Sequence, residues 1–317
     1  MSDSPVQDPV VSVLVISYNT REMTLECLRS LERETTIPHE VLVVDNNSQD
    51  GSAEAISEEF PHINLMARKD NLGFAGGNNM AAKQARGEYI LLLNPDTVVL
   101  DHAVDNLVAF ARETPGAGIW GGRTLFGDKS LNPASCWQRM TLWNVFCRTA
   151  GLTSLFPNSA IFNAERYGGW QRDSVREVDI VQGSFFLMRR GDWDRLGGFN
   201  EDFFMYGEEA DLCLRAIKTG ARPQITPDAT IIHYGGASEK VLSDRMVKTL
   251  AGKMGLINRH FPAWQKPLGR FVFSMMPLTR LIATKAGATL TGRPSLKESA
   301  ATWGAIWQRR RDWQSGW

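Results

Sequence analysis

Apolar runs and amphipathic segments alternate along the first two thirds of the chain, and this alternation predicts an α/β fold. Nearly continuous β-branched and aliphatic runs at 10–17, 40–44 and 89–93 are typical of parallel strands that are buried on both faces. The other elements expected here are a helix from Thr20 to before Pro38, a helix at 53–60, a short strand at 63–67 and a helix at 78–86. Strands and helices in this order predict a mostly parallel sheet with helices on both faces.

The pattern is less regular in the following part of the chain. Residues 132–176 have no clear period, and we expect loops and short helices there. Strand patterns return at 178–189 and 229–233, and a helix is expected at 207–220 because Gly220 can end it. These elements extend the same α/β domain.

Charge divides the chain more clearly than composition does. The 317 residues are 43% hydrophobic and include 35 basic and 35 acidic residues, as in an ordinary soluble globular protein. Residues 240–317, however, contain 14 Lys or Arg and 3 acidic residues, a net charge of +11, so residues 1–239 carry −11. We therefore expect two domains, at 1–240 and 241–317, the second being a basic, Trp-containing helical extension.

Cysteine spacing and the length of apolar runs bear on the cellular compartment. The 4 cysteines form no Cys-x-x-Cys pair and no regular spacing, which argues against a structural zinc site and a disulfide framework. No charge-free apolar run approaches the roughly 18 residues needed to span a bilayer, and the acidic first ten residues differ from a signal peptide. We expect a cytoplasmic protein that is neither exported nor membrane-spanning.

Polar residues follow three of the expected strands directly. They are Ser17-Tyr18-Asn19, Asp45-Asn46-Asn47 and Asn94-Pro95-Asp96. In an open α/β sheet, ligands bind at the carboxyl ends of the strands. The Asp96 carboxylate could hold Mg²⁺ or Mn²⁺ beside phosphate oxygens, and Asp45 could accept hydrogen bonds from a base or a ribose. A Pro-containing turn explains Asp96 equally well. For Asp45 a helix cap is the structural alternative, and the ligand-binding interpretation is favoured.

Three further features could carry chemistry. A glycine-rich stretch at 71–79 lets backbone approach a ligand, although such a turn is weak evidence by itself. The carboxylates of Glu208, Glu209 and Asp211 begin a helix beside aromatic residues, where they either favour the helix dipole or raise one another's pKa towards that of a general base. His233, at the end of the last strand, is either a structural residue or a metal ligand.

In combination, these residues resemble the inverting nucleotide-sugar glycosyltransferases of family two, and most closely the bacterial rhamnosyltransferases of O-antigen or cell-wall polysaccharide synthesis. The matching stretches, which span 10–233, are VSVLVISYNT, VVDNNSQDGS, NLGFAGGNN, YILLLNPDTVV, VQGSFFLMRR and LGGFNEDFFMYGEEADLCLRAIKTG. The resemblance implies a GT-A fold, a metal ion and a nucleotide-sugar donor. It also implies a single in-line displacement that inverts the anomeric centre.

The resemblance also implies roles for individual residues. The residues expected around the nucleotide are Ser17, Tyr18, Asn19, Asp45, Asn71, Gly76 and Asn94. Asp96 and His233 are expected to bind Mg²⁺ or Mn²⁺, with Asn94 where many relatives carry the first Asp of the metal motif. Glu209, where many relatives carry Asp, is expected to be the base. The residues expected near the donor or acceptor sugar are Gly183, Glu208 and Asp211.

The sequence therefore predicts a glycosyltransferase that moves a sugar to a growing glycan, either free or lipid-linked. The resemblance favours L-rhamnose from dTDP-L-rhamnose; a UDP-sugar transferase and an inactive carbohydrate-binding relative stay open. A dinucleotide oxidoreductase is disfavoured because Gly-x-Gly-x-x-Gly is missing after the first strand. The basic tail suits the inner face of an anionic membrane, and packing on the catalytic domain or in a homodimer explains it equally well. Nucleic-acid binding is not expected, since no recognition motif accompanies the charge.

Overall fold

The computed structural model of the chain describes residues 8–235 and 241–317, and these form two compact units. The first unit consists of 8–137, 171–204 and 212–235, and the second of 138–170, 205–211 and 241–317. Residues 138–170 precede the expected boundary at 240, yet they group with the C-terminal helices. The two domains expected from the sequence stay a prediction, because the compact units do not follow a single cut in the chain.

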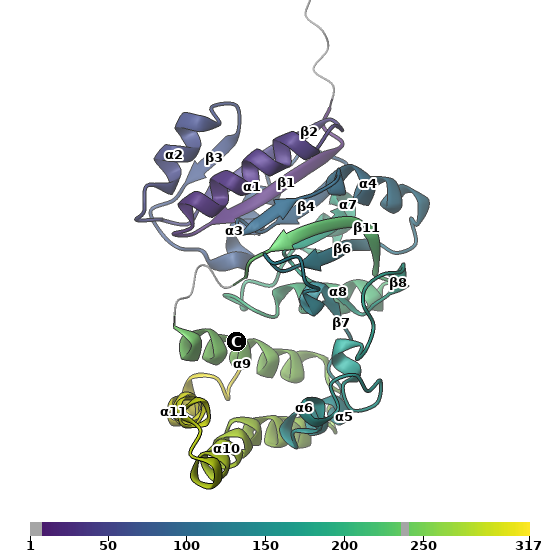
Figure 1. The fold of residues 1–317 in the computed structure, drawn as a ribbon. Helices are drawn as coiled ribbons and strands as arrows, with labels where there is room; N and C mark the ends of the chain where they lie inside the picture. Colours follow the sequence, from purple (N-terminus) through teal and green to yellow (C-terminus); the bar gives the residue numbers. More distant parts are fainter. Residues whose placement is uncertain (1–7, 236–240) are drawn as a thin grey trace, which may run out of the picture. The chain divides into compact units, whose positions relative to one another are not determined.

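A nine-stranded sheet forms the centre of the first unit (Figure 1). Eight strands follow the order β3-β2-β1-β4-β10-β6-β11-β5, and β8 pairs with β11. The bounds are β1 (Val11–Ser17), β2 (His39–Asp45), β3 (Asn64–Ala67), β4 (Tyr89–Leu93), β5 (Thr97–Val99), β6 (Ile119–Leu125), β8 (Arg176–Glu177), β10 (Phe185–Arg189) and β11 (Gln224–His233). A separate pair is formed by β7 (Cys136–Trp137) and β9 (Ile180–Val181).

The strand directions differ between the two halves of this sheet. From β3 to β4 all neighbours are parallel, as the sequence predicts. β10 then lies antiparallel between β4 and β6, while β11 is parallel to β6 and antiparallel to β5. The predicted α/β class is confirmed. The sheet is mixed in its second half because β10 is antiparallel to both of its neighbours and β11 is antiparallel to β5 and β8.

Helices cover both faces of the sheet. On one face, Val11, Val13 and Val15 of β1 pack in a single core with α1 (Arg21–Glu34), α2 (Ser52–Glu59) and α4 (Ala103–Glu113). Successive strand residues point to opposite faces, so the intervening positions of β1 face α3 (Gly73–Ala82). α7 (Arg190–Leu196) packs against β4 and β10. Full burial of a side chain the size of valine stabilises the fold by about 1.5 kcal/mol.

Most predicted elements have the expected type, and the errors lie at boundaries. α3 begins at Gly73, five residues before the predicted start at 78, and β11 begins at Gln224 instead of 229. The helix expected at 207–220 is α8 (Glu208–Lys218). Residues 97–125, for which no element was predicted, form β5, α4 and β6.

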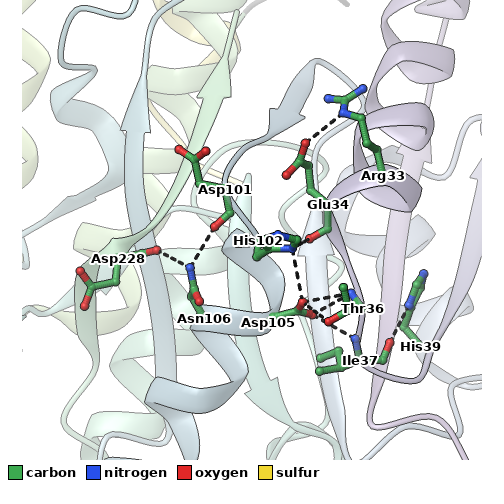
Figure 2. Close-up of polar contacts among 10 residues, drawn as sticks. All are labelled: Arg33, Glu34, Thr36, Ile37, His39, Asp101, His102, Asp105, Asn106 and Asp228. Atoms are coloured by element: carbon green, nitrogen blue, oxygen red, sulfur yellow. Dashed lines mark hydrogen bonds and ion pairs between the residues drawn. The ribbon is translucent and has the colours of Figure 1, made fainter.

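Asp105, in the first turn of α4, fixes the connection between α1 and β2 (Figure 2). Its carboxylate accepts hydrogen bonds from the backbone N–H groups of Thr36 and Ile37 and from the Thr36 hydroxyl, at 2.6–3.1 Å. The next residue, Asn106, donates from Nδ2 to the carbonyl oxygens of Asp101 and Asp228. These contacts stabilise the end of the sheet at which β2 begins, which is opposite to the end that carries Asp45.

The second unit is helical, which confirms the predicted helical extension. Its helices are α5 (Leu142–Thr149), α6 (Leu152–Leu155), α9 (Leu242–His260), α10 (Lys266–Thr291) and α11 (Pro294–Gln308). Met254 and Ile257 of α9, Phe273 of α10, Ile306 of α11 and Trp313 form its core. Among the described helices, none combines the length and the apolar character needed to cross a bilayer.

A buried ionic cluster lies within the second unit. The Glu165 carboxylate is 2.7 Å from Arg148 Nη2 and 2.7 Å from Lys253 Nζ. Burial opposes its ionisation, but the two cations and their hydrogen bonds lower the pKa of Glu165 to about 2. Burial and the charge of Arg148 lower the pKa of Lys253 to about 8. One carboxylate thus holds two cations that repel each other.

Candidate active site

The carboxyl ends of β1 and β2 lie side by side in the first unit, with Ser17 directly opposite Asp45. The loops that follow are tied together: the Asn19 N–H donates to Ser48 Oγ (2.9 Å), and Asn19 Oδ1 accepts from the Gln49 N–H (2.7 Å). Asn19 has a φ of 53°, a left-handed conformation that Asn tolerates. The three residues expected after β1 therefore shape one loop at the ligand-binding edge of the sheet.

The exposure of these three residues differs. Ser17 is fully buried, and its hydroxyl lies 3.2 Å from Thr24 Oγ1. Tyr18 is half-buried and Asn19 is exposed. Tyr18 and Asn19 are therefore accessible to a ligand, whereas Ser17 has a structural partner.

Asp45 is buried and uses only one of its carboxylate oxygens. Oδ1 accepts a hydrogen bond from the Ser48 N–H at 2.9 Å, whereas Oδ2 has no partner among the described residues. This hydrogen bond closes a turn after β2. The helix-capping role considered for Asp45 is not present, because Gly51 is the N-cap of α2, and one acceptor oxygen of Asp45 remains. A buried acceptor without a partner costs about 1–3 kcal/mol, which a donor group of a ligand would recover.

The glycine-rich stretch is the first turn of α3 and its packing surface. Asn71 Oδ1 accepts from the Gly73 N–H at 2.8 Å, and Asn46 Nδ2 donates to the Gly73 carbonyl at 3.0 Å. A Cβ on Gly77 would be 2.9 Å from Ile16 Cγ2, and one on Gly76 would be 3.1 Å from Leu72 Cβ. Close packing accounts for these two glycines, and the Asn71 side chain accepts from the first N–H of α3, whose N-cap is Leu72. The nucleotide-binding roles expected for Asn71 and Gly76 stay predictions.

Three polar side chains meet beyond the end of β4. His233 Nε2 lies 3.1 Å from Asp96 Oδ1 and 3.4 Å from Asn94 Nδ2, although His233 and Asp96 are 137 positions apart along the chain. The pairing of β11 with β5 places His233 opposite Thr97, which explains this proximity. Burial opposes ionisation of Asp96, but its hydrogen bond to His233 and the imidazole charge lower its pKa.

The donor atoms of this cluster fit a divalent cation. Asn94 Oδ1 and His233 Nδ1 are buried without a partner among the described residues. A carboxylate, an imidazole and an amide oxygen suit Mg²⁺ or Mn²⁺. No group of three His, Cys, Asp or Glu side chains that could hold a metal occurs in the described part of the chain. Such an ion would therefore need further ligands, and substrate phosphates commonly supply them to Mg²⁺.

Gly183 lies in the turn between β9 and β10, next to this cluster. The Asn94 N–H donates to the carbonyl of Ser184 at 3.2 Å. The Thr97 hydroxyl donates to the Asn94 carbonyl at 2.7 Å. Ser184 and Thr97 were not singled out from the sequence; Thr97 follows the Asn-Pro-Asp motif directly, which is a signal that could have identified it.

The carboxylates at the start of α8 belong to the second unit and have distinct environments. Glu208 is buried and its Oε2 has no partner among the described residues, whereas Glu209 is partly exposed and accepts a hydrogen bond from the Gly207 N–H at 3.3 Å. Burial, together with the neighbouring Glu209, raises the pKa of Glu208 well above its usual range. Burial also raises the pKa of Glu209, although backbone hydrogen bonds and the Lys253 charge offset part of this effect.

Asp211 has a structural contact within the same unit. Its Oδ1 lies 2.8 Å from His260 Nε2 of α9, and both side chains are buried. This contact joins the first turn of α8 to α9. The sugar-binding role expected for Asp211 stays a prediction, as does the convergence of Glu209 with Asp45 and Asp96.

Comparisons with known proteins indicate a glycosyltransferase. The sequence profile described as glycosyl transferase family 2 matches residues 12–192. The chain is similar to an N-acetylglucosaminyl-diphospho-decaprenol L-rhamnosyltransferase of Mycobacterium tuberculosis, with 27% identity over 91% of this chain and 97% of the relative. It is also similar to a rhamnosyltransferase of Escherichia coli, with 26% identity over 80% of this chain and 97% of the relative.

A solved structure shares the fold. A mannosyltransferase of Pyrobaculum calidifontis, determined with GDP-Man and Mn²⁺, superimposes with a TM-score of 0.56 at 19% identity. The match covers 96% of this chain and 87% of that protein.

Proposed function

The chain belongs to glycosyl transferase family 2, and from this premise we propose that it transfers L-rhamnose from dTDP-L-rhamnose to a hydroxyl group of a growing glycan. The GT-A fold expected from the sequence is confirmed. Two relatives named as rhamnosyltransferases support the choice of donor sugar. The observation that carries the proposal is the cluster of Asn94, Asp96 and His233 at the same edge of the sheet as Asp45.

The nucleotide occupies the loops after β1 and β2 in this proposal. Asp45 Oδ2 is the acceptor for a hydrogen bond from the base or the ribose, because it is buried and has no partner among the described residues. Tyr18 and Asn19 are accessible from solvent and line the nucleotide. The left-handed conformation of Asn19 keeps its loop in contact with Ser48 and Gln49.

Asp96, His233 and Asn94 would hold Mg²⁺ or Mn²⁺ and so position the donor diphosphate. When bound, the ion would supply positive charge that stabilises the departing diphosphate. The Pyrobaculum calidifontis mannosyltransferase, which shares the fold, was determined with Mn²⁺ together with a nucleotide sugar, and this supports the assignment. The hydrogen bond between His233 and Asp96 orients the carboxylate and favours its ionised form.

Glu209 is the general base of the proposed reaction. Its carboxylate takes the proton from the acceptor hydroxyl as that oxygen attacks the anomeric carbon, the bond to the diphosphate oxygen breaks, and dTDP leaves with inversion. Partial exposure lets a hydroxyl group reach Glu209, and its raised pKa brings it closer to neutrality. Glu208 is buried, so a positioning role beside Glu209 suits it better.

The acceptor is proposed to be a lipid-linked saccharide. The name of the Mycobacterium tuberculosis relative describes transfer to N-acetylglucosamine on diphospho-decaprenol, and the match covers 97% of that protein. A lipid-linked acceptor would place the reaction at the inner face of the cytoplasmic membrane.

Donor binding tests the proposal without requiring the acceptor. In a thermal-shift series with Mn²⁺, dTDP-L-rhamnose should raise the unfolding midpoint more than UDP- or GDP-sugars, since a ligand at 100 times its Kd stabilises by about 2.7 kcal/mol. Asp45→Asn should reduce this shift, because the amide places either an N–H donor or a less basic oxygen at the position of Oδ2. Asp70→Asn, at an exposed ion pair with Arg68, is the matched control and should leave the shift unchanged. A larger shift with a UDP-sugar would reassign the donor, and no shift with any nucleotide sugar would contradict the proposal.

A further inference from the structure

The outward face of α10 is apolar along the length of the helix. Leu268, Phe271, Ile282 and Leu290 are 51%, 63%, 59% and 86% exposed. At 100° per residue these four positions fall within one side of the helix, because their spacings of 3, 11 and 8 residues are close to whole turns. Large exposed apolar patches mark interaction sites on soluble proteins.

The opposite face of α10 is buried in the second unit. Phe273, Met276 and Pro277 are buried, and the first two belong to its helical core. A helix that is apolar on both sides needs a second apolar environment besides its own core. Packing within the second unit accounts for only one of the two faces.

The neighbouring helix α5 also carries exposed aromatic residues. α5 packs against α10, and α6 lies beside α5 (Figure 1). Trp143 and Phe146 of α5 stack with ring centroids 5.8 Å apart and are both 46% exposed. The Trp143 indole N–H donates to the Ile161 carbonyl at 3.0 Å, which fixes the ring although it faces solvent. Amphipathic aromatic rings of this kind are enriched at the interface between bilayer and water.

Positive charge borders the apolar face. Residues 261–297 contain six Lys or Arg and no acidic residue. Lys285 and Lys297 line an open cavity of about 610 Å³ between α10 and α11, whose other lining residues are mostly small, such as Ala288 and Gly304. Two ammonium groups beside this cavity provide a place for a lipid phosphate. Basic residues near an anionic bilayer each contribute measurably to binding.

From these observations we propose that the outward face of α10, together with Trp143 and Phe146, docks on an anionic lipid bilayer. The helix would lie in the interface with Phe271 and Ile282 inserted, while Lys285 and Lys297 contact lipid phosphates. The inference rests on the proposed function, because docking on a bilayer would bring the enzyme to a lipid-linked acceptor. Its location on the molecule depends only on α5, α10 and α11.

Co-sedimentation of the full chain with vesicles tests this surface. Wild type should bind vesicles of phosphatidylcholine mixed with phosphatidylglycerol more strongly than vesicles of phosphatidylcholine alone. The double variant Phe271→Gln, Ile282→Gln should bind about 100-fold more weakly, because two apolar side chains no longer enter the bilayer. The double variant Lys285→Ala, Lys297→Ala should lose about fivefold per lysine on the anionic vesicles, and nothing on the neutral ones.

A matched control removes two apolar side chains of similar exposure from the first unit. Phe126 and Val175 are 41% and 53% exposed, so Phe126→Gln, Val175→Gln should bind vesicles as wild type does. Equal binding by wild type and the Phe271, Ile282 variant would overturn the proposal, as would failure of wild type to bind anionic vesicles. Light scattering provides a further test. If wild type is a dimer that does not bind vesicles, and the Phe271, Ile282 variant is a monomer, the apolar face of α10 serves self-association and the proposal is wrong.

The outcomes separate this inference from the proposed function. Vesicle binding needs no donor, and the thermal shift with dTDP-L-rhamnose needs no vesicle. Loss of vesicle binding with an intact donor shift would reject only the docking surface. Vesicle binding without a donor shift would reject only the proposed function.

Discussion

Replacing Glu165 with glutamine should strongly destabilise the second unit. The carboxylate is buried and lies 2.7 Å from both Arg148 Nη2 and Lys253 Nζ. Its pKa falls from 4.5 to about 2, a difference worth about 3 kcal/mol at 1.36 kcal/mol per pH unit. Removing one partner of a buried ion pair commonly costs about 3–5 kcal/mol, which agrees with this magnitude. A loss of about 3 kcal/mol should lower the unfolding midpoint by about 10 °C.

The loss of stability in Glu165→Gln should depend on pH in a defined direction. Because the folded state lowers the pKa of Glu165, its contribution to stability is complete above pH 4.5 and is lost as the pH falls from 4.5 towards 2. The difference in unfolding free energy between wild type and Glu165→Gln should therefore be largest at pH 7. It should shrink steadily below pH 4.5.

Urea unfolding followed by tryptophan fluorescence measures this difference. Seven of the 10 tryptophans lie in the second unit, so the signal reports mainly on that unit. Asp312→Asn is the control, because the pair between Asp312 and Arg309 is about half exposed and contributes no more than about 1 kcal/mol. A loss below 1 kcal/mol for Glu165→Gln, or a loss of equal size at pH 7 and pH 3, would refute the reasoning.

Three further predictions concern the candidate site and the helix that supports it. In an initial-rate assay, Glu209→Gln should lower the rate of sugar transfer by about 10²–10⁴-fold with little change in donor affinity. Glu208→Gln should lower the rate much less. A larger loss for Glu208→Gln would exchange the roles of the two residues. Burial raises the pKa of Glu208, so wild type loses stability as the pH rises above 4.5, and Glu208→Gln should gain in thermal midpoint relative to wild type between pH 5 and 8. An unchanged difference across that range would show that Glu208 titrates normally. Gly73→Ala should lower the free energy of unfolding, measured with urea, by at least about 1–2 kcal/mol. The reason is that Gly73 has a φ of +70° and that a Cβ there would lie 2.4 Å from the Phe204 carbonyl oxygen. An unchanged urea midpoint would mean that α3 shifts to accommodate the methyl group.

The parallel half of the sheet could be predicted because each strand carries its own signal. The aliphatic runs at 10–17, 40–44 and 89–93 are long, bounded by turn residues and separated by helical segments. The predicted strand at 89–93 agrees with β4 at both ends. Polar residues after these strands then identify the ligand-binding edge.

The start of α3 could not be predicted from local propensity. Glycine disfavours helices by about 1 kcal/mol, so Gly73, Gly76 and Gly77 predict a turn. The structure places them in a helix because Gly77 lets α3 approach Ile16 of β1 closely. A tertiary contact outweighs the local preference, and a single sequence does not reveal such contacts.

The proximity of Asp96 and His233 was expected only from the resemblance to a known family. The two residues are far apart in the chain, and their distance of 3.1 Å depends on the pairing of β11 with β5. β5 has three residues, which is too short for a reliable strand pattern. The same limit explains why residues 138–170, which have no clear period, were not assigned to the second unit.

Transfer of labelled sugar from dTDP-L-rhamnose to a lipid-linked diphospho-saccharide, by wild type and by Asp96→Asn, tests the central claim most directly. Wild type should form an inverted glycosidic product, and Asp96→Asn should lower the rate at least about 100-fold while it unfolds cooperatively, since the carboxylate that would hold the ion is lost. Transfer by Asp96→Asn at the wild-type rate, or no transfer by wild type from any nucleotide sugar, would contradict the account.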